Sequence, residues 1–413
     1  MNYEQAEAYL LDLELFGMRF GLDRMHKLMT VLGMPQRRFA SVHVVGSNGK
    51  SSTVRMIAAV LERHGLRTGT YTSPHLRSFS ERIEVGEKPV DEPAFAAAVT
   101  RVAHAASLVN RTAAPDDRVT QFEALTAAAY HELARRGVEV AVVEAGLGGR
   151  WDATNVIPSK VQVLTSVGLE HTRWLGPTIA DIAAEKLAVV RDHATLVTGS
   201  LPPEADAVVA RVVAERHARL VRAPLDGVAP ALARGAFQRR NFAVATAAAE
   251  AFLGSLDSAA VASAAAHVEV PGRLQLVSPD GPLVFQDGAH NPAGAAALAE
   301  ALPEVVGDRR LVAVIGVLDD KDAASMLQAV LPLCGAVVFT RSSNPRSLPP
   351  ATLEALAAQV GGPAESESVA DPRAAVARAA ELAGPDGAVI ATGSIYLIAD
   401  LVREPGVARA SRL

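Results

Sequence analysis

An apolar segment that runs into a glycine-rich turn constrains this chain more than any other feature. Residues 42–53 read Val-His-Val-Val-Gly-Ser-Asn-Gly-Lys-Ser-Ser-Thr, and a helix-compatible segment follows at 54–61. Gly46 and Gly49 allow the backbone to curl so that successive N–H groups face an anion, and a helix N-terminus adds partial positive charge. Lys50 adds a mobile full charge for the outer phosphates. The pattern predicts a strand, loop and helix that cradle nucleotide phosphates.

Val44 shows that this loop departs from the common pattern. A glycine is usual at this position of a phosphate loop, and its replacement by valine indicates a shortened variant. The departure narrows the set of nucleotide-binding families that the loop can belong to.

Apolar strands that alternate with helical stretches predict an α/β fold of two domains. At 413 residues the chain has the length of about two to three domains. The turn-rich segment 278–282, Ser-Pro-Asp-Gly-Pro, is the best linker candidate. Beyond it, predicted strands at 283–286, 311–315, 336–340 and 388–392 alternate with predicted helices at 293–302, 323–331, 351–360 and 372–382. We therefore expect a P-loop-containing domain at 1–277 and a smaller Rossmann-like α/β domain at 283–413.

Composition limits the partners and the location. A net charge of -5 and a pI near 6.1 argue against broad nucleic-acid or membrane-surface binding, because both require a basic face. Cys334 is the only cysteine and lies in an apolar stretch, which predicts a buried thiol rather than a nucleophile. The first residues are acidic, and no apolar run approaches the ~20 residues that span a bilayer. We expect a cytoplasmic monomer that acts on small molecules, without nucleic-acid or membrane partners.

A carboxylate closes one of the predicted strands of the first domain. Glu144 ends the apolar run at 138–143, and glycines follow it within 146–149. A carboxylate at a strand end beside a phosphate loop is where a P-loop protein holds Mg²⁺. The plainer alternative is a carboxylate exposed at the edge of the sheet.

Two further strand ends carry polar side chains. His171 follows the apolar strand at 161–167, and Asp287 with His290 follows the first strand of the second domain. Turn chemistry accounts for Gly, Asn and Pro in the cluster 287–292, but not for an aspartate with a histidine. Because ligands collect at the carboxyl ends of parallel strands, all three side chains are candidate binding residues.

For several charged side chains, the sequence is also consistent with a structural or surface role rather than a binding role. Arg19 and Arg24 are equally consistent with solvated surface charge and with anion binding. Glu123 follows Thr120 at the spacing of a capping box, which is its favoured role. Lys186, inside a helical stretch, is by itself typical of a surface lysine whose stem packs on apolar surface.

Five motifs occur in an order that resembles a known family. They are Gly-Ser-Asn-Gly-Lys-Ser-Ser at 46–52, Thr-Ser-Pro-His-Leu at 72–76, Glu144 with Gly-Leu-Gly-Gly-Arg at 146–150, Asp-Ala-Thr-Asn at 152–155, and Asp-Gly-Ala-His-Asn-Pro at 287–292. Together they resemble the folylpolyglutamate synthase/dihydrofolate synthase family of the Mur ligase superfamily. The resemblance covers nearly the whole chain and implies a P-loop-containing N-terminal ATPase domain followed by a Rossmann-like ligase domain.

The resemblance also implies a set of site residues. ATP phosphates would lie on Gly46, Ser47, Asn48, Gly49, Lys50, Ser51 and Ser52, and ATP would also contact Asn241, Arg273, Asp287 and His290. Mg²⁺ would be held by Ser73, Glu144 and His171. Lys186 matches a lysine that such ligases can carbamylate to bind a second metal, and Lys50, His171 and Lys186 would serve catalysis. Two departures stand out: Ser51 replaces the usual glycine, and Leu-Ala-Val-Val-Arg at 187–191 replaces the usual Ala-Gly-Ile-Ile-Lys.

The family reaction joins glutamate to a pterin-containing acceptor by way of an acyl phosphate. An anionic acceptor would meet Arg19, Arg24, Ser73, His75, Arg77 and Arg82, and its flat ring would need an apolar slot that Phe16, Phe20 and Phe79 could line. The acceptor is expected to be dihydropteroate, a reduced folate or both.

Two other functions compete with this interpretation. A cell-wall Mur ligase with a nucleotide-sugar acceptor carries an additional N-terminal domain, whereas only 45 residues precede Gly46 here, which is short of the ~50 residues of the smallest domains. A nucleotide-dependent switch protein is the alternative from a different class.

Overall fold

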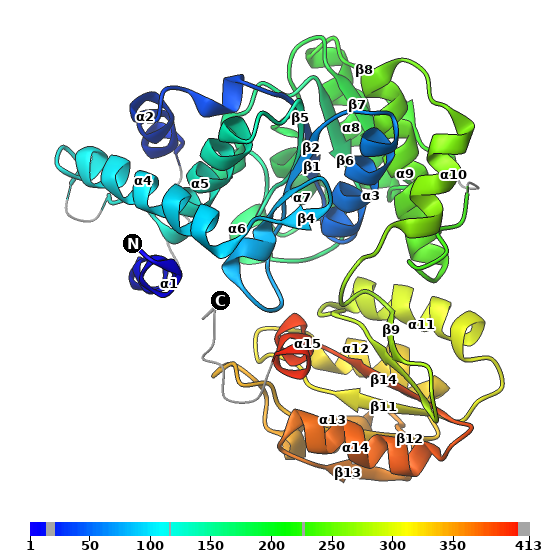
Figure 1. The fold of residues 1–413 in the computed structure, drawn as a ribbon. Helices are drawn as coiled ribbons and strands as arrows, with labels where there is room; N and C mark the ends of the chain where they lie inside the picture. Colours follow the sequence, from blue (N-terminus) through cyan, green and yellow to red (C-terminus); the bar gives the residue numbers. More distant parts are fainter. Residues whose placement is uncertain (14–20, 115–116, 225–227, 404–413) are drawn as a thin grey trace. The chain divides into compact units, whose positions relative to one another are not determined.

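The computed structural model describes residues 1–13, 21–114, 117–224 and 228–403, and these form two compact units (Figure 1). The first unit contains Met1–Val228 and Arg240–Ala266, and the second contains Ala229–Arg239 and His267–Val407 as far as they are described. The second unit therefore begins earlier than the expected boundary. Residues 278–282, interpreted from the sequence as a linker, connect two paired strands of the second sheet.

The first sheet has eight strands in the order β4-β3-β2-β5-β1-β6-β7-β8. The strands are β1 (Ala40–Val45), β2 (Thr68–Tyr71), β3 (Ile83–Val85), β4 (Lys88–Pro89), β5 (Val140–Glu144), β6 (Val161–Leu164), β7 (Thr195–Thr198) and β8 (Arg219–Arg222). In this sheet order, every neighbouring pair from β2 across to β8 is parallel. β3 and β4 pair antiparallel at the other edge, beside β2. The central strands are buried along almost their whole length, which explains their continuous apolar runs.

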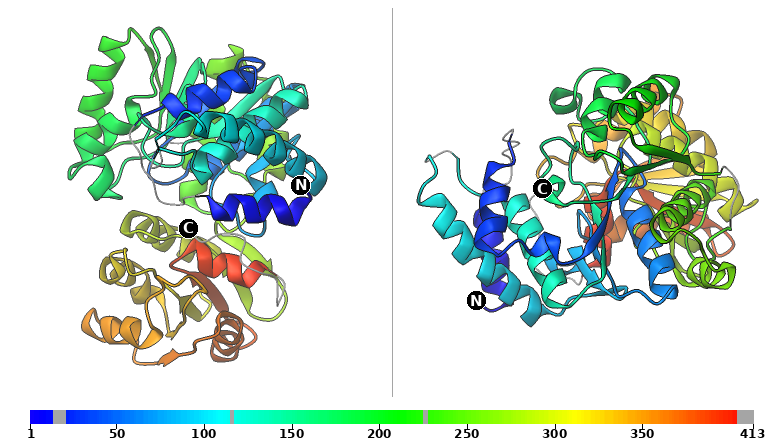
Figure 2. Two further views of the ribbon diagram at one scale, coloured as in Figure 1. Left: turned by 90° about the vertical axis from the view of Figure 1, so that its left-hand side faces the viewer. Right: turned by 90° about the horizontal axis from the view of Figure 1, so that it is seen from above.

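Helices cover both faces of this sheet (Figure 2). They are α1 (Tyr3–Asp12), α2 (Asp23–Val31), α3 (Lys50–Arg63), α4 (Glu92–Asn110), α5 (Gln121–Arg135), α6 (Thr172–Leu175), α7 (Ile179–Leu187), α8 (Pro203–Glu215), α9 (Ala236–Leu253) and α10 (Ser258–His267), with short 3₁₀ helices η1 (Pro35–Arg37), η2 (Phe79–Arg82) and η3 (Ala153–Val156). The capping box predicted for Thr120 and Glu123 is confirmed, since each side chain bonds the other residue's backbone N–H.

The second sheet has six strands in the order β13-β12-β11-β14-β10-β9. Its elements are β9 (Gln275–Ser278), β10 (Leu283–Gln286), α11 (Pro292–Val306), β11 (Leu311–Ile315), α12 (Ala323–Val330), η4 (Leu331–Leu333), β12 (Ala336–Phe339), α13 (Pro350–Gln359), β13 (Ser366–Ser368), α14 (Pro372–Ala383), β14 (Ala388–Thr392) and α15 (Ile395–Val402). The strands predicted at 283–286, 311–315 and 388–392 coincide with β10, β11 and β14. Sequence patterning missed β9 and β13, the two edge strands, because neither is an apolar run.

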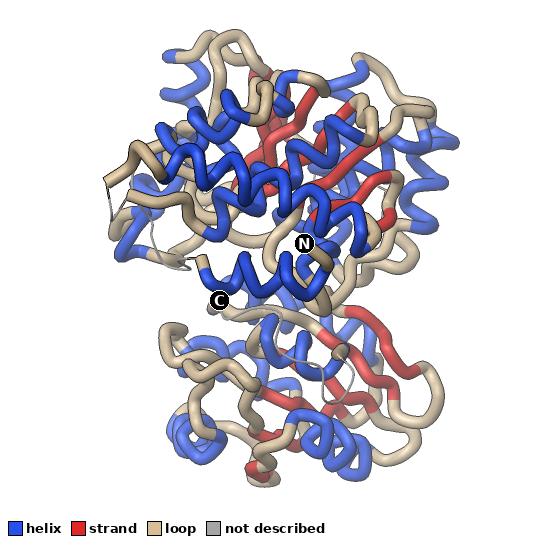
Figure 3. Tube along the Cα trace, turned by 60° about the vertical axis from the view of Figure 1, so that its left-hand side comes forward, coloured by secondary structure: helices blue, strands red, loops and turns tan. Residues whose placement is uncertain are grey.

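The apolar side chains of α11, α12 and α13 pack on one face of the second sheet, while α14 and α15 contact its strands separately from that core. Figure 3 shows this alternation of strands and helices in both units. Cys334 is half-buried at the end of η4, and burial raises the pKa of its thiol to about 12, as expected for a thiol that is not a nucleophile. Within the described residues, no helix is both long and apolar enough to cross a bilayer.

Candidate active site

Three strand ends meet where the phosphate loop leaves the first sheet. β1 lies between β5 and β6, with Val44 in register with Glu144 and Val45 in register with Leu164. The loops that follow these three strands therefore begin side by side at the carboxyl edge, where parallel sheets place their ligands.

Two glycines of the phosphate loop have positive φ angles and no room for a side chain. Gly46 has a φ of 153°, and a Cβ atom there would overlap the hydroxyl of Thr165. Gly49 has a φ of 84° and caps α3, and a Cβ atom there would lie 2.5 Å from Asn241 Oδ1. Only glycine fits both positions. The structure thus brings Asn241 of α9 directly against the loop at the start of α3.

The end of β6 braces the phosphate loop by hydrogen bonds. Asn48 N donates to Ser166 Oγ over 2.9 Å, and the hydroxyls of Thr165 and Ser166 donate to Asn48 O over 2.7 and 3.0 Å. Ser47 Oγ accepts from Gly168 N over 3.0 Å. No local pattern predicts this bracing, because the hydroxyls lie about 120 residues away from the loop in the chain.

Glu144 accepts hydrogen bonds from the phosphate loop and from Ser73 of the predicted metal site. Its carboxylate is buried and accepts from Ser51 Oγ over 3.0 Å and from Ser73 N over 3.1 Å. A phosphate-loop hydroxyl beside a strand-end carboxylate is the Mg²⁺-binding arrangement of P-loop proteins. Ser73 approaches Glu144 through its backbone amide.

Lys186 is buried, and the interpretation as a surface lysine is wrong. Its side chain is 1% exposed, and Nζ donates to Gly46 O over 2.9 Å and to Glu170 Oε1 over 3.1 Å. Lys50 Nζ donates to the same carbonyl over 3.0 Å and to Ser47 O over 3.2 Å. Two ammonium groups therefore converge on Gly46 O. Burial lowers the pKa of Lys186 to about 8, although the carboxylate of Glu170 opposes this shift.

Glu170 is a site residue that sequence reasoning missed. Burial alone would raise the pKa of Glu170, but the charges of Lys50, Lys186 and His171 lower it to about 2. Its only sequence signal was its position beside His171 at the end of a strand. The structure makes it the ion-pair partner of Lys186, and the charge of Lys50 acts on it as well.

His171 is exposed, with a φ of 48°, at the N-terminal cap of α6. Among the described residues, no three His, Cys, Asp or Glu side chains form a ready-made metal cluster. Glu144 with Ser51 nevertheless fits Mg²⁺, because this ion keeps several waters and binds through one or two carboxylates plus substrate phosphates.

The arginines expected to meet the acceptor have different surroundings. Arg24 is buried and paired with the carboxylates of Glu123 and Asp117, so its charge is already compensated within the fold. Arg77 is exposed. Arg19, like Phe16 and Phe20, lies outside the described residues.

His75, Phe79 and Arg82 form a packed cluster behind the loop that begins at Ser73. Arg82 Nε donates to His75 Nδ1 over 2.9 Å, and Arg82 is 1% exposed. The rings of His75 and Phe79 lie 4.5 Å apart, and the guanidinium of Arg82 lies 5.4 Å from the Phe79 ring. These side chains therefore shape the loop from within. Phe79 is fully buried in this cluster, and its expected part in lining a pterin slot stays a prediction.

In the second unit, Asp287 organises the polar cluster at the end of β10. It is buried, and its two oxygens accept from Leu274 N over 2.8 Å and from Ala289 N over 2.7 Å. Burial raises the pKa of Asp287, while Arg273 opposes the shift. Arg273 lies against Gly288, and His290 Nδ1 lies 2.9 Å from Gly288 O. The cluster predicted from the sequence thus exists, but Asp287 acts on the backbone around it.

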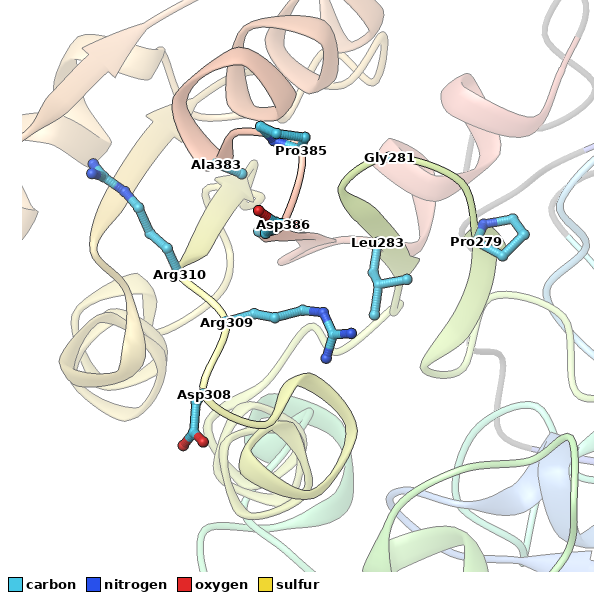
Figure 4. A pocket seen from close by; sticks show the side chains of 10 residues that line it. Pro279, Gly281, Leu283, Asp308, Arg309, Arg310, Ala383, Pro385 and Asp386 are labelled. Atoms are coloured by element: carbon cyan, nitrogen blue, oxygen red, sulfur yellow. The ribbon is translucent and has the colours of Figure 1, made fainter.

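A hollow of about 700 Å³ lies elsewhere in the second unit (Figure 4). Its lining includes Leu283 at the start of β10, Arg310 just before β11 and Gly387 just before β14. These are the amino ends of the strands, whereas Asp287 and His290 follow a carboxyl end. The hollow is therefore separate from the candidate site.

Comparison with known proteins yields consistent matches along the chain. Residues 272–395 match the family model "Mur ligase, glutamate ligase domain". The chain is 37% identical to the dihydrofolate synthase/folylpolyglutamate synthase of Mycobacterium tuberculosis over 380 residues. This alignment covers 82% of this chain and 77% of the relative.

Solved structures agree over a larger share of the chain. Mycobacterium tuberculosis folylpolyglutamate synthase complexed with ADP matches with a TM-score of 0.89 and 34% identity over 97% of both chains. E. coli FolC in complex with DHPP and ADP matches with a TM-score of 0.86 and 29% identity, again over 97% of both chains.

Proposed function

Since the chain belongs to the folylpolyglutamate synthase/dihydrofolate synthase family, we propose that it is an ATP-dependent ligase that joins L-glutamate to dihydropteroate, to a reduced folylpolyglutamate, or to both. The observation that carries the proposal is the convergence of Lys50, Lys186 and Glu144 on a phosphate loop. Relatives solved with ADP, and one with DHPP as well, support the choice of nucleotide and of acceptor.

The phosphate loop and Lys50 would bind the β- and γ-phosphates of ATP. Lys50 Nζ lies on the loop carbonyls of Gly46 and Ser47, and it has to exchange these acceptors for phosphate oxygens. The backbone N–H groups of 46–49 and the N-terminus of α3 add positive potential at the same place. Asn241, packed against Gly49, would keep the loop in its binding conformation.

Glu144, Ser51 and the Ser73 segment would hold Mg²⁺, with His171 joining from the end of β6. The ion would supply charge neutralisation at the phosphate oxygens during transfer. Glu144 would orient these groups through the bonds that it already accepts from Ser51 and Ser73.

Lys186 is proposed to react with CO₂ and to act as an anionic carbamate. A pKa of about 8 for Lys186 leaves about a tenth of the amine neutral at pH 7. The neutral nitrogen attacks the CO₂ carbon and loses one proton. The product cannot keep the ion pair with Glu170, so the carboxylate of Glu170 has to turn away from Lys186.

The acceptor carboxylate is too weak an electrophile to react with an amine directly, so it has to be activated first. The acceptor carboxylate attacks the γ-phosphorus of ATP and releases ADP, which gives an acyl phosphate. The α-amine of glutamate attacks the acyl carbon, loses a proton, and expels phosphate from the tetrahedral intermediate to leave an amide. Because the transferring group is highly charged, positioning and charge compensation by Lys50 carry most of the catalysis that we propose.

The other predicted site residues would bind ATP, bind the acceptor or support the loops around them. Arg273 and His290 would contact ATP, while Asp287 would shape their loop. Exposed Arg77 would meet the anionic acceptor together with Arg19, and His75 and Arg82 would support the loop behind Ser73. We also propose that the protein is cytoplasmic and monomeric. Light scattering of the purified chain tests the monomeric state.

The direct test offers labelled glutamate and ATP with dihydropteroate, with tetrahydrofolate and with a uridine-linked muramyl acceptor in parallel. Incorporation into at least one pterin acceptor is expected. Incorporation only into the muramyl compound, or into none while ATP is hydrolysed, would reject the proposal. Incorporation into one pterin acceptor alone would remove the claim of dual activity.

A further inference from the structure

A buried histidine sits inside the strand that delivers the phosphate loop. His43 occupies the middle of β1, is fully buried and lies three residues before Gly46. Its Nε2 lies 2.8 Å from Thr154 Oγ1, and its Nδ1 has no hydrogen-bond partner among the described residues. The proposed chemistry makes no use of this residue. A polar group in such a core strand requires another explanation.

The direction of the hydrogen bond follows from the neighbours of Thr154. The oxygens of Asp152 accept from Thr154 N over 3.0 Å and from Leu147 N over 2.9 Å, and the Thr154 hydroxyl donates its single proton to the same carboxylate. Thr154 Oγ1 can therefore only accept from His43, so Nε2 carries the proton. Burial, with the charge of Arg191 adding to it, lowers the pKa of His43 to about 3, which keeps the ring neutral.

Thr154 and Asp152, which accept the hydrogen bonds described above, both belong to the segment 146–155, which follows Glu144. Arg150 N donates to Glu185 O over 3.1 Å, and Arg150 Nε pairs with Glu185 Oε2 over 3.1 Å. Gly149 packs so closely on α7 that a Cβ atom would lie 2.5 Å from Lys186 O. One end of the segment thus adjoins Glu144, and its middle rests on the backbone of Lys186.

We propose that His43 is a positioning residue: by donating to Thr154, it fixes segment 146–155 to β1 and so sets the spacing between Glu144 and Lys186. The inference rests on the proposed roles of these two residues as metal-site groups. Because His43 is fully buried, it would touch neither substrate nor metal. It acts through Thr154 and Asp152, in the way that outer partners orient the residues of a metal site.

Two substitutions separate the donated hydrogen bond from the presence of a polar side chain. In His43→Gln, the side-chain amide nitrogen is the same number of bonds from Cα as Nε2 of the histidine. The glutamine can therefore still donate to Thr154. In His43→Asn the amide is one bond shorter and the donor is lost. Gln162→Leu is the matched control, because Gln162 is buried on β6 in register with His43 and, among the described residues, its side chain bonds only to Ser159.

Activity and hydrogen exchange are then measured on the full chain. For H43N we expect kcat to fall about tenfold and the Mg²⁺ concentration for half-maximal activity to rise about tenfold, with KM for ATP changed less than about twofold. The amides of Leu147 and Thr154 should exchange faster in H43N, and H43Q should restore every value. Q162L should lower the melting temperature without moving the Mg²⁺ dependence or these two amides.

Three results would overturn the proposal. The first is that H43N keeps the wild-type Mg²⁺ dependence and the wild-type amide exchange. The second is that H43Q loses as much activity as H43N. The third is that Q162L shows the same shift in Mg²⁺ dependence as H43N. If the wild-type protein transfers glutamate to no acceptor, the proposed function fails. Hydrogen exchange without ligands still decides the positioning role in that case, since faster exchange only in H43N supports it and unchanged exchange rejects it.

Discussion

Replacing Glu170 by glutamine tests whether the charges around Gly46 act together. The change keeps the size of the side chain and an acceptor for Lys186 Nζ, which lies 3.1 Å from Glu170 Oε1, but removes the negative charge. The side chains of Glu170 and Lys186 are 10% and 1% exposed, so water screens this pair weakly. We therefore expect a measurable loss in the free energy of unfolding of the first unit.

The magnitude follows from the pKa of the carboxyl group. Burial raises the pKa of Glu170, and the charges of Lys50, Lys186 and His171 outweigh it and lower the pKa from an ordinary 4.5 to about 2. A difference of roughly 2.5 units corresponds to about 3 kcal/mol at neutral pH. Glutamine keeps the hydrogen bond, so a loss of about 1–3 kcal/mol is expected.

The pH dependence has a definite sign. Because the folded-state pKa of Glu170 lies below the unfolded-state value, its contribution is fully present above about pH 4.5 and disappears as the pH falls toward 2. E170Q should therefore be less stable than the wild type at pH 7.5, and the difference should shrink steadily from pH 5 to pH 3.

Thermal unfolding of the wild type and E170Q across this pH range is the assay. At about 2–4 °C per kcal/mol for a unit of this size, a loss of about 1–3 kcal/mol should lower the melting temperature by roughly 2–12 °C at pH 7.5. Glu304→Gln is the control. Glu304 pairs with Arg239, but its side chain is 49% exposed, so this substitution should change the melting temperature little. Equal stability at pH 7.5, or a difference of constant size down to pH 3, would refute the reasoning.

Three further substitutions test the site and its surroundings. Lys50→Ala should leave a folded protein whose ADP production falls at least about a hundredfold, because the mobile charge at the outer phosphates is lost; near-normal ADP release would remove the loop from the mechanism. Glu144→Gln should raise the Mg²⁺ concentration for half-maximal activity about tenfold or more, and an unchanged Mg²⁺ titration would return Glu144 to a structural role. Arg24→Met should lower the free energy of unfolding by about 3 kcal/mol, since it leaves the buried carboxylate of Glu123 without its ion pair, while KM for the acceptor stays within about twofold; a large rise in that KM with unchanged stability would restore Arg24 as a substrate ligand.

Local sequence determined the elements and the phosphate loop. The strand at 42–45, the glycines at 46 and 49 and the lysine at 50 are adjacent in the chain, so backbone sterics and side-chain charge already specify the cradle. The capping box of Thr120 and Glu123 could be read directly for the same reason, since its two members are three residues apart. The carboxyl-end position of Glu144 followed from the apolar run before it.

Tertiary structure decided which charges are buried and which partners they have. Lys186 has a surface lysine's sequence environment, yet it donates to Gly46 O, 140 residues away. Arg24 was a candidate ligand from its sequence position, and its guanidinium pairs with Glu123, 99 residues away. Glu170 gained its role only because the segment after β6 pairs it with Lys186. The free energy of a charge depends on its desolvation and on nearby opposite charge, and both are set by packing between segments that no local pattern relates.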